Sequence, residues 1–319
     1  MKDIQIEVRK AKFFRRKSFL IPAVFLLVLV AFLLSLLRPD ISDAELLPIY
    51  APDPSRFLEV KGVRVHYRDE GRGPVLLLVH GTFSSLHTWE GWTQKLKNRF
   101  RIVRLDIPGH GLTGHAPGED YTIQGYISFL DAFANALHLN RFHLAGNSLG
   151  GLIAWNYTVA HPGKVDRLIL IDSAGFRRGS PPPIFLLARS VLGSYLRYAT
   201  PEFLVRWNLK SVYGNPALAK DETLKRYYDL VRRQGNRDAF MKRLEQIQFT
   251  DTSSLTGIKN RTLILWGAKD PWINPSMARD FLKAIKNSHL ILYPDAGHVP
   301  MEEIPDQTAE DAEVFLTAP

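Results

Sequence analysis

Seven short apolar runs between residues 63 and 293 constrain the fold of this chain most strongly. They are rich in Leu, Ile and Val and occupy residues 63–67, 75–79, 102–105, 142–144, 168–171, 262–265 and 290–293. Several are continuously apolar, which is typical of strands buried on both faces. Helix-length patterns at 122–139, 149–160 and 275–285 lie between them. This alternation predicts an α/β fold with βα units on a mostly parallel sheet.

Residues 177–260 interrupt this alternation, because their pattern is helical and rich in Tyr, Phe, Leu and Arg. The segment carries a net charge of +8, residues 1–17 carry +5, and the rest of the chain sums to −4 within a total of +9. Charge confined to two segments does not indicate nucleic-acid binding. The basic insertion is interpreted as a solvated face, as an attraction for an anionic substrate, or as a contact with anionic lipid. The candidate lipid-contacting residues are Arg232, Arg233, Lys242 and Arg243.

An apolar stretch near the N-terminus, residues 19–37, contains no charged side chain and is broken only by Pro22 and Ser35. Its length is about what an α-helix needs to cross the hydrocarbon core of a bilayer. We therefore predict a transmembrane anchor over residues 18–38. A cleavable signal peptide is the alternative, but its apolar region would be roughly 7–15 residues long and would end at small residues. Residues 36–40 offer no such cleavage site.

The charges that flank this stretch predict its orientation. Most of the basic residues of segment 1–17 directly precede it, whereas Arg38 is the only basic residue that follows within the next sixteen positions. The positive-inside bias then predicts a cytoplasmic segment over 1–17 and a catalytic domain exported to the periplasmic or extracellular side. Residues 39–56 contain four prolines and are predicted to form an extended linker.

A G-N-S-L-G-G sequence that contains Ser148 lies between a predicted strand and a predicted helix. A serine on such a tight turn has strained backbone angles, and glycines two positions before and after it remove the Cβ atoms that would collide. Its hydroxyl would stand at the carboxyl edge of the sheet, where the positive end of the next helix faces a developing oxyanion. A purely structural glycine turn is the alternative. The context favours Ser148 as a nucleophile.

Two later loops contain the partners that a serine nucleophile needs. Asp270 follows the strand at 262–265, and His298 follows the last strand in the sequence D-A-G-H. Of the ten histidines, His298 is preferred because it follows a glycine at the predicted catalytic edge, whereas the others that we compared fall inside strand patterns, at helix ends or in connections. The rival acid is Asp172, whose alternative role is a turn or capping carboxylate. The sequence thus predicts Asp270 as the acid and His298 as the base.

Oxyanion binding is predicted for backbone N–H groups near the serine. The H-G-T-F sequence that contains Thr82 and Phe83 follows a central strand. The N–H of Thr82, with that of Phe83 as a substitute, is expected to act together with the N–H of Leu149. The glycine-rich sequence at 106–111 is interpreted as architectural, with His110 outside the triad.

The motifs H-G-T-F, D-x-P-G-H-G, G-N-S-L-G-G, W-G-x-x-D and D-A-G-H resemble those of the α/β-hydrolase superfamily in order and approximate spacing, over roughly residues 57–318. The resemblance implies an eight-stranded, mostly parallel sheet with an inserted helical cap. The implied assignments are a core over 57–176 and 261–319, a cap over 177–260, and the triad Ser148, Asp270 and His298.

The resemblance also narrows the reaction class. A serine at the elbow argues against haloalkane dehalogenases and epoxide hydrolases, and the missing H-G-G-P-G turn argues against prolyl aminopeptidases. Carbon–carbon-bond hydrolases share the elbow, but their H-G-x-G-P-G turn is absent. We therefore expect a carboxylesterase or lipase-like serine hydrolase with an acyl-enzyme on Ser148. The alternatives are a carbon–carbon-bond hydrolase, lactonase or acyltransferase on the same triad, and a binding module without activity.

Neither metal nor organic cofactor is required by this mechanism, and a chain without cysteine has no disulfide, thiol nucleophile or thiolate zinc site. The expected partners are a small-molecule or lipid ester and, through residues 18–38, a membrane. The physiological substrate and the oligomeric state stay open. The aromatic and leucine residues of the cap could line an acyl pocket or pack the cap itself: Phe185, Leu186, Leu187, Tyr195, Tyr198, Phe203, Trp207, Tyr213, Tyr227, Tyr228 and Phe240.

Overall fold

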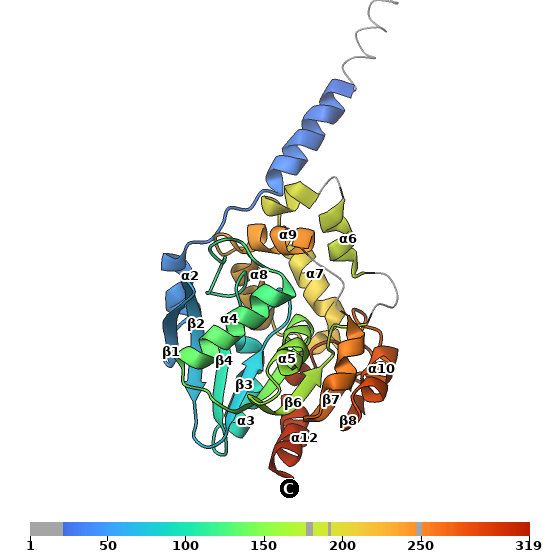
Figure 1. Ribbon diagram of the computed structural model, residues 1–319. Helices are drawn as coiled ribbons and strands as arrows, with labels where there is room; N and C mark the ends of the chain where they lie inside the picture. The colour runs from blue at the N-terminus through green and yellow to red at the C-terminus, as the bar shows by residue number, and fades with distance from the viewer. Residues whose placement is uncertain (1–21, 177–180, 191–192, 247–250) are drawn as a thin grey trace, which may run out of the picture.

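An eight-stranded sheet forms the centre of the structure, a computed structural model that describes residues 22–176, 181–190, 193–246 and 251–319 (Figure 1). The strands are β1 (Ser55–Val60), β2 (Val63–Glu70), β3 (Val75–Val79), β4 (Arg101–Leu105), β5 (Phe142–Asn147), β6 (Val165–Ile171), β7 (Arg261–Gly267) and β8 (Ser288–Tyr293). Their order is β1-β2-β4-β3-β5-β6-β7-β8, and only β2 runs antiparallel to its neighbours. The predicted mostly parallel sheet is confirmed, with the seven apolar runs in β2 to β8. Strand β1 has no counterpart among those runs.

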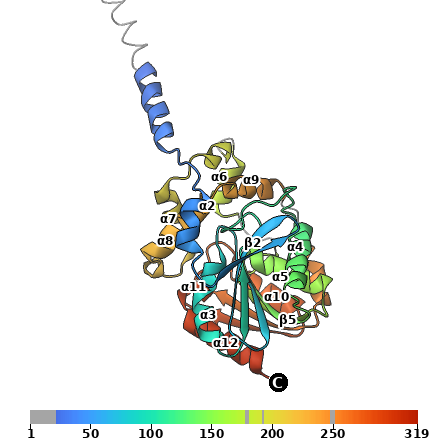
Figure 2. The same ribbon diagram turned by 90° about the vertical axis from the view of Figure 1, so that its left-hand side faces the viewer.

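Helices cover both faces of the sheet. They are α2 (Asp43–Tyr50), α3 (Glu90–Leu96), α4 (Ile123–Ala136), α5 (Leu149–Ala160), α6 (Pro183–Arg189), α7 (Glu202–Val212), α8 (Asp221–Val231), α9 (Asn236–Gln246), α10 (Ser276–Ala284), α11 (Pro300–Glu303) and α12 (Pro305–Thr317). Helices α4, α5 and α10 lie on one face, and α3 and α12 lie on the other (Figure 2). The three predicted helical patterns coincide with α4, α5 and α10.

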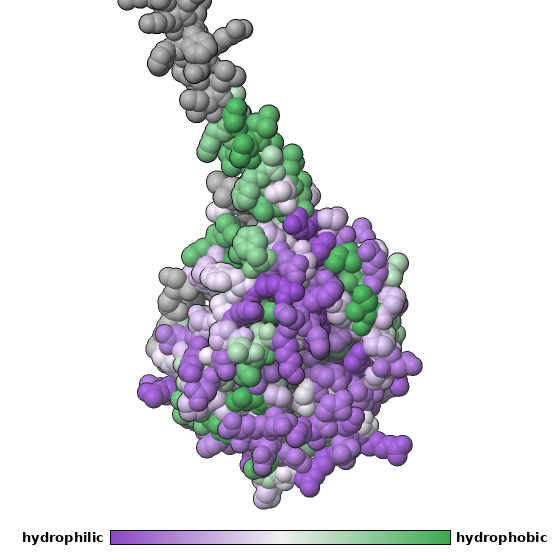
Figure 3. All heavy atoms as spheres, turned by 180° about the vertical axis from the view of Figure 1, so that it is seen from behind, coloured by the Kyte–Doolittle hydropathy of each residue, from purple (hydrophilic) through white to green (hydrophobic). Residues whose placement is uncertain are grey.

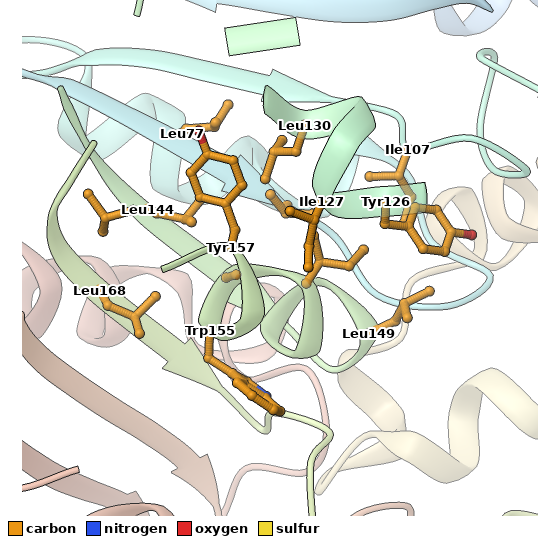
Figure 4. Close-up of a cluster of buried hydrophobic side chains, with 14 of the residues drawn as sticks. Leu77, Ile107, Tyr126, Ile127, Leu130, Leu144, Leu149, Trp155, Tyr157 and Leu168 are labelled. Atoms are coloured by element: carbon orange, nitrogen blue, oxygen red, sulfur yellow. The ribbon is translucent and has the colours of Figure 1, made fainter. Parts of the chain in front are cut away.

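Apolar side chains of the central strands fill the core between the sheet and these helices. Leu77, Leu144 and Leu168 are fully buried against Leu130 of α4 and Tyr157 of α5 (Figure 4). Burying one such leucine stabilises the fold by about 1.5–3 kcal/mol. The continuous apolar runs are therefore explained by burial on both faces of the sheet.

The register brings the ends of the parallel strands to one edge. Val79 of β3 pairs with Leu105 of β4 and with Gly146 of β5, and Ile171 of β6 pairs with Leu265 of β7. Because these residues are at or next to the carboxyl ends of their strands, the loops that follow them gather at the same edge. Helices α6 to α9, which lie between β6 and β7 in sequence, cover that edge (Figure 1).

A helix over residues 22–35 projects from the body of the molecule (Figure 1). Its apolar side chains are exposed, and they form the hydrophobic projection in Figure 3. In the described part of the chain, no helix is both long enough and apolar enough to cross a bilayer. The predicted span begins before residue 22, and the predicted cytoplasmic segment 1–17 lies outside the described residues. The membrane anchor stays a prediction.

The extended linker predicted over residues 39–56 is wrong, because residues 43–50 form helix α2 and strand β1 already begins at Ser55. The Glu45 carboxylate accepts hydrogen bonds from the N–H and hydroxyl of Ser42, at 3.3 and 2.8 Å, and so starts the helix. Leu46 is buried on the body, and the Tyr50 hydroxyl donates to Asp229 of α8 at 2.7 Å. The N-terminal cap and the buried contacts of α2 thus stabilise a helix in spite of the prolines in this segment.

Candidate active site

Ser148 lies on a strained turn between β5 and α5. Its backbone has φ +55° and ψ −115°, in a region that favours glycine, and its side chain is buried. The two flanking glycines are required by close packing. A Cβ on Gly146 would lie 2.2 Å from the carbonyl oxygen of Gly150, and one on Gly150 would lie 2.1 Å from that of Val79. The predicted elbow geometry is therefore present.

His298 and Asp270 are held together by a direct hydrogen bond. The imidazole Nδ1 lies 2.8 Å from Asp270 Oδ2, and both side chains are buried. The other carboxylate oxygen of Asp270 accepts from the N–H groups of Trp272 and Ile273 at 2.7 and 3.0 Å. These two bonds orient the carboxylate, so that Oδ2 faces the ring and fixes the tautomer that leaves Nε2 without a proton.

The second ring nitrogen of His298, Nε2, is the one left to act as a base. Nε2 is buried and has no hydrogen-bond partner among the described residues, and His298 and Ser148 line the same cavity. No hydrogen bond joins Ser148 to His298 within the described part of the chain. The Asn147 amide ties the two loops together, because it donates to the carbonyl of His298 at 3.0 Å. Catalytic hydrogen bonds often tighten only when substrate is bound.

Asp172, the rival acid, lies beside this pair without bonding to the imidazole. Its backbone φ is +42°, its side chain is fully buried, and Oδ1 accepts from the N–H of Gly267 at 3.0 Å. Burial, with the nearby Asp270 carboxylate, raises the pKa of Asp172 well above the ordinary range. The structure thus places Asp270 in contact with His298, and Asp172 beside the pair without a bond to the imidazole.

Asp172, Asp270 and His298 also form a potential metal-ligand cluster, with one donor atom of each within 4.8 Å of the others. A tetrahedral zinc ion bound to both Nδ1 and Oδ2 at roughly 2.0–2.1 Å would hold them about 3.3 Å apart. The observed separation of 2.8 Å instead fits a direct hydrogen bond. The donor set therefore fits a triad acid and base rather than a metal centre.

The turn after β3 lies against the serine elbow. A Cβ on Gly81 would lie 3.0 Å from the Cβ of Ser148, and Phe83 has φ +63°. Thr82 lines the space beside Ser148. Leu149 opens α5, so its N–H has no acceptor within that helix. Thr82 and Leu149 are thus both next to the serine, as an oxyanion site requires.

The glycine-rich turn at 106–111 is held in place by hydrogen bonds to the buried side chain of Asp106. The buried Asp106 carboxylate accepts from the N–H groups of Leu86 and Leu112 at 2.7 and 2.8 Å and from His66 Nδ1 at 2.8 Å. The facing histidines lower its pKa although burial alone would raise it. His110 also lines a cavity beside Ser148, a position that the sequence did not indicate, and burial holds its pKa well below the ordinary range.

Two cavities meet at Ser148. The first, of about 110 Å³, contains His298 and is walled mainly by apolar side chains of α7 and α8. The second, of about 230 Å³, extends past Leu149 toward Arg243 and Gln246 of α9. Of the cap residues proposed for an acyl pocket, Tyr227 and Phe240 line the first cavity and Phe185 lines the second, whereas Tyr198, Phe203 and Trp207 are exposed.

The cationic residues predicted to contact lipid do not form one free surface. Arg233 pairs with Asp43 at 2.7 Å, and Arg232 donates to the carbonyl of Pro39 at 2.9 Å. Arg243 is buried beside Ser148. The prediction that these arginines face lipid is therefore wrong for Arg243, because helix periodicity did not reveal which face of α9 packs onto the core.

Comparisons with known proteins agree with this architecture. The family profile described as alpha/beta hydrolase fold matches residues 74–305. Lipase 1 of Psychrobacter immobilis is 29% identical over 261 residues, which are 80% of this chain and 81% of that protein. The 2-hydroxy-6-oxononadienedioate/2-hydroxy-6-oxononatrienedioate hydrolase of Escherichia coli K12 is 27% identical over 279 residues, 83% of this chain and 96% of that protein. The crystal structure of a membrane phospholipase A has a TM-score of 0.70 and 28% identity, and the match covers 94% of this chain and 98% of that chain.

Proposed function

The chain belongs to the alpha/beta hydrolase fold family, and from this premise we propose that it cleaves carboxylic esters through an acyl-enzyme on Ser148. The observation that carries the proposal is the oriented His298 imidazole. Asp270 holds its Nδ1 at 2.8 Å, its Nε2 has no hydrogen-bond partner among the described residues, and the ring belongs to a cavity that Ser148 also lines. A base that is held by a carboxylate and lines the same cavity as a strained serine suits acyl transfer.

In the proposed reaction, Ser148 Oγ attacks the ester carbonyl while His298 Nε2 takes the hydroxyl proton. The N–H groups of Thr82 and Leu149 stabilise the negative charge on the carbonyl oxygen. His298 then gives the proton to the departing alcohol, and an acyl-enzyme remains. A water molecule deprotonated by His298 releases the acid. Asp270 keeps the tautomer and stabilises the imidazolium in both steps.

We further propose that residues 18–38 anchor the protein in a membrane, with the N-terminus cytoplasmic and the catalytic domain exported. Support comes from the uncharged stretch, from the exposed apolar side chains of helix 22–35, and from the match to a membrane phospholipase A over 94% of this chain. The protein should pellet with membranes after alkaline extraction and keep residues 1–38 by mass. An N-terminus that begins near Asp40 would instead mean a cleaved export signal.

A carbon–carbon-bond hydrolase is the second candidate, because the Escherichia coli relative is named for such a reaction and the same elbow sequence occurs in that group. Lactonase and acyltransferase activities would use the same triad. A panel of 4-nitrophenyl esters, lactones, a vinylogous ring-cleavage diketone and an alcohol acceptor separates these reactions. The highest kcat/KM for a simple ester supports the first candidate, and the highest kcat/KM for the diketone supports the second.

Labelling by a fluorophosphonate, followed by ester kinetics, tests the assignment of the triad on the detergent-solubilised full chain. The wild type should be labelled and Ser148→Ala should not. Ser173→Ala, which removes another buried hydroxyl near the elbow, should keep the label. Asp270→Asn and His298→Ala should each lower kcat by about 10³–10⁶-fold while the protein stays folded. Labelling of Ser148→Ala at the wild-type level would refute Ser148 as the nucleophile.

A further inference from the structure

Arg243 is a buried cation without an anionic partner in the part of the chain that the structure describes. Its side chain belongs to α9 and is 5% exposed. No carboxylate of residues 22–176, 181–190, 193–246 or 251–319 forms an ion pair with it. The interior masked segments 177–180, 191–192 and 247–250 contain no Asp or Glu. Arginine is almost never fully buried unless it is paired, since an uncompensated charge in the interior is costly.

The hydrogen-bonding capacity of Arg243 is largely unused. Nη2 donates to the Thr82 hydroxyl at 3.2 Å, and the buried Nε has no hydrogen-bond partner among the described residues. The guanidinium carbon lies 5.7 and 6.0 Å from the ring centres of Phe240 and Phe185. These rings hold the side chain in place but do not neutralise it. Burial lowers the pKa of Arg243, and nearby Arg189 lowers it further, although a guanidinium stays charged in proteins.

Arg243 lies beside the candidate nucleophile. It lines the second cavity together with Ser148 and Leu149, so a group that contacts the guanidinium is close to the ester bond. Gln246, one helical turn further along α9, adds an amide to the same wall. The first cavity has mainly apolar walls, and the arginine in its lining, Arg237, pairs with Asp40 at 2.6 Å. Ser148 therefore adjoins a mainly apolar cavity and a second cavity whose arginine has no carboxylate partner among the described residues.

We propose that Arg243 binds an anionic group of the substrate, so that the enzyme prefers esters with a carboxylate or phosphate near the scissile bond. This inference rests on the proposed ester hydrolysis and names its substrate class. A planar guanidinium with a free Nε suits a forked contact to two oxygens of such an anion. The substrate supplies the counter-charge that no described residue provides.

Three matched substrate pairs measure this preference on the full chain. The anion is on the acyl side in 4-nitrophenyl hemiglutarate, whose methyl ester is the neutral partner. It is on the alcohol side in 4-carboxyphenyl butyrate, with 4-carbamoylphenyl butyrate as its partner. The third pair, 1-butyrylglycerol 3-phosphate and 1-butyrylglycerol, distinguishes phosphate from carboxylate. For each pair, the kcat/KM of the anionic ester is divided by the kcat/KM of the neutral ester. This ratio is then compared between each variant and the wild type, so that differences in leaving-group reactivity cancel.

Arg243→Met should lower this ratio by about 10- to 100-fold for at least one pair, the range expected for a lost hydrogen bond to a charged group. Arg243→Lys keeps the positive charge but cannot make the forked contact, so its ratio should lie between those of the wild type and Arg243→Met. Arg104→Met is the matched control, because Arg104 is also buried but pairs with Glu70 at 2.7 Å and lines neither cavity; its ratio should not change. Unchanged ratios for Arg243→Met in all three pairs would overturn the proposal.

A merely structural role of Arg243, holding the turn through Thr82, is tested separately. Thr82→Val removes the acceptor and should keep the ratio, whereas a structural role predicts the same loss as in Arg243→Met. Calorimetry of 4-nitrophenyl hemiglutarate and 1-butyrylglycerol 3-phosphate with Ser148→Ala measures binding without turnover. Tighter binding of an anionic ester than of its neutral partner, abolished by adding Arg243→Met, supports the proposal even if no ester is cleaved. Absence of any preference there overturns it, whereas absence of turnover by wild type refutes only the proposed reaction.

Discussion

Asp172 should be protonated in the folded protein at neutral pH, and Asp172→Asn tests this. Its side chain is fully buried, and burial together with the Asp270 carboxylate raises its pKa well above that of an ordinary aspartic acid. Asparagine is a neutral substitute of almost the same shape. Its Oδ1 can still accept from the N–H of Gly267, a bond of 3.0 Å in the wild type, and its amide can donate toward Asp270. We therefore expect the fold to tolerate this change.

The magnitude follows from proton linkage. In the unfolded chain, a carboxyl group loses its proton around pH 3.9, whereas folded Asp172 keeps it to higher pH. Between these two pKa values the folded state binds more protons, so the free energy of unfolding falls as pH rises, by about 1.4 kcal/mol per pH unit. The contribution of Asp172 to stability is thus fully present below the unfolded pKa and is lost toward neutral pH. The asparagine variant does not undergo this loss.

Urea unfolding of the detergent-solubilised protein at pH 5, 6 and 7, followed by tryptophan fluorescence, measures the effect. The unfolding free energy of Asp172→Asn, relative to wild type, should increase by about 1.4 kcal/mol per pH unit until the folded pKa is passed. Asp295→Asn, which removes a carboxyl whose side chain is 90% exposed, is the control. A difference between Asp172→Asn and wild type that stays constant from pH 5 to 7 would show that Asp172 is already ionised in the fold, and would refute the reasoning.

Two further substitutions test the packing of the elbow and the attachment of the cap. Gly150→Ala puts a Cβ 2.1 Å from the carbonyl oxygen of Val79, so we expect it to lower the unfolding free energy by about 1–3 kcal/mol or more. Gly163→Ala is the control, because Gly163 has open space around it and its substitution should not lower the unfolding free energy. Equal urea midpoints for the two variants would contradict this expectation. Glu302→Gln leaves the guanidinium of Arg226 without its charged partner at 2.8 Å and should lower the unfolding free energy by about 3–5 kcal/mol. Adding Arg226→Met removes the unpaired charge, so the double variant should regain most of this loss. Additive losses in a double-mutant cycle would refute the coupling.

Much of the fold could be predicted because its signals are local. Apolar runs indicated the seven strands β2 to β8, and the runs are most continuous in β3 to β7, which are buried on both faces of the sheet. The elbow at Ser148 was equally local, because glycines are needed within two positions of the strained residue. Helix α2 was missed because it packs against a distant segment; Tyr50 bonds to a residue 179 positions away. Strand β1 was missed because it is a partly exposed edge strand without a continuous apolar run.

The roles of the two acids required the tertiary structure. Asp172 and Asp270 both follow strands that end at the same edge, so chain order made either one a candidate. Only the packed structure distinguishes them, since Asp270 is the acid that contacts His298 while Asp172 is desolvated behind it. The pKa of each carboxyl depends on burial and on charges that are brought close by folding, and no local sequence pattern contains that information.

The chain by itself determined the sheet and the elbow, because strand burial and backbone strain depend on neighbouring residues, and it gave the chain order of the candidate nucleophile, acid and base. The tertiary structure decided which cap residues face the serine. Arg243 belongs to a basic helical segment in which solvent, lipid and substrate were all possible partners, and only the packing of α9 turns it inward, beside Ser148 and away from every described carboxylate. A helix has several polar faces, and the contacts that bury one of them come from residues far away in sequence.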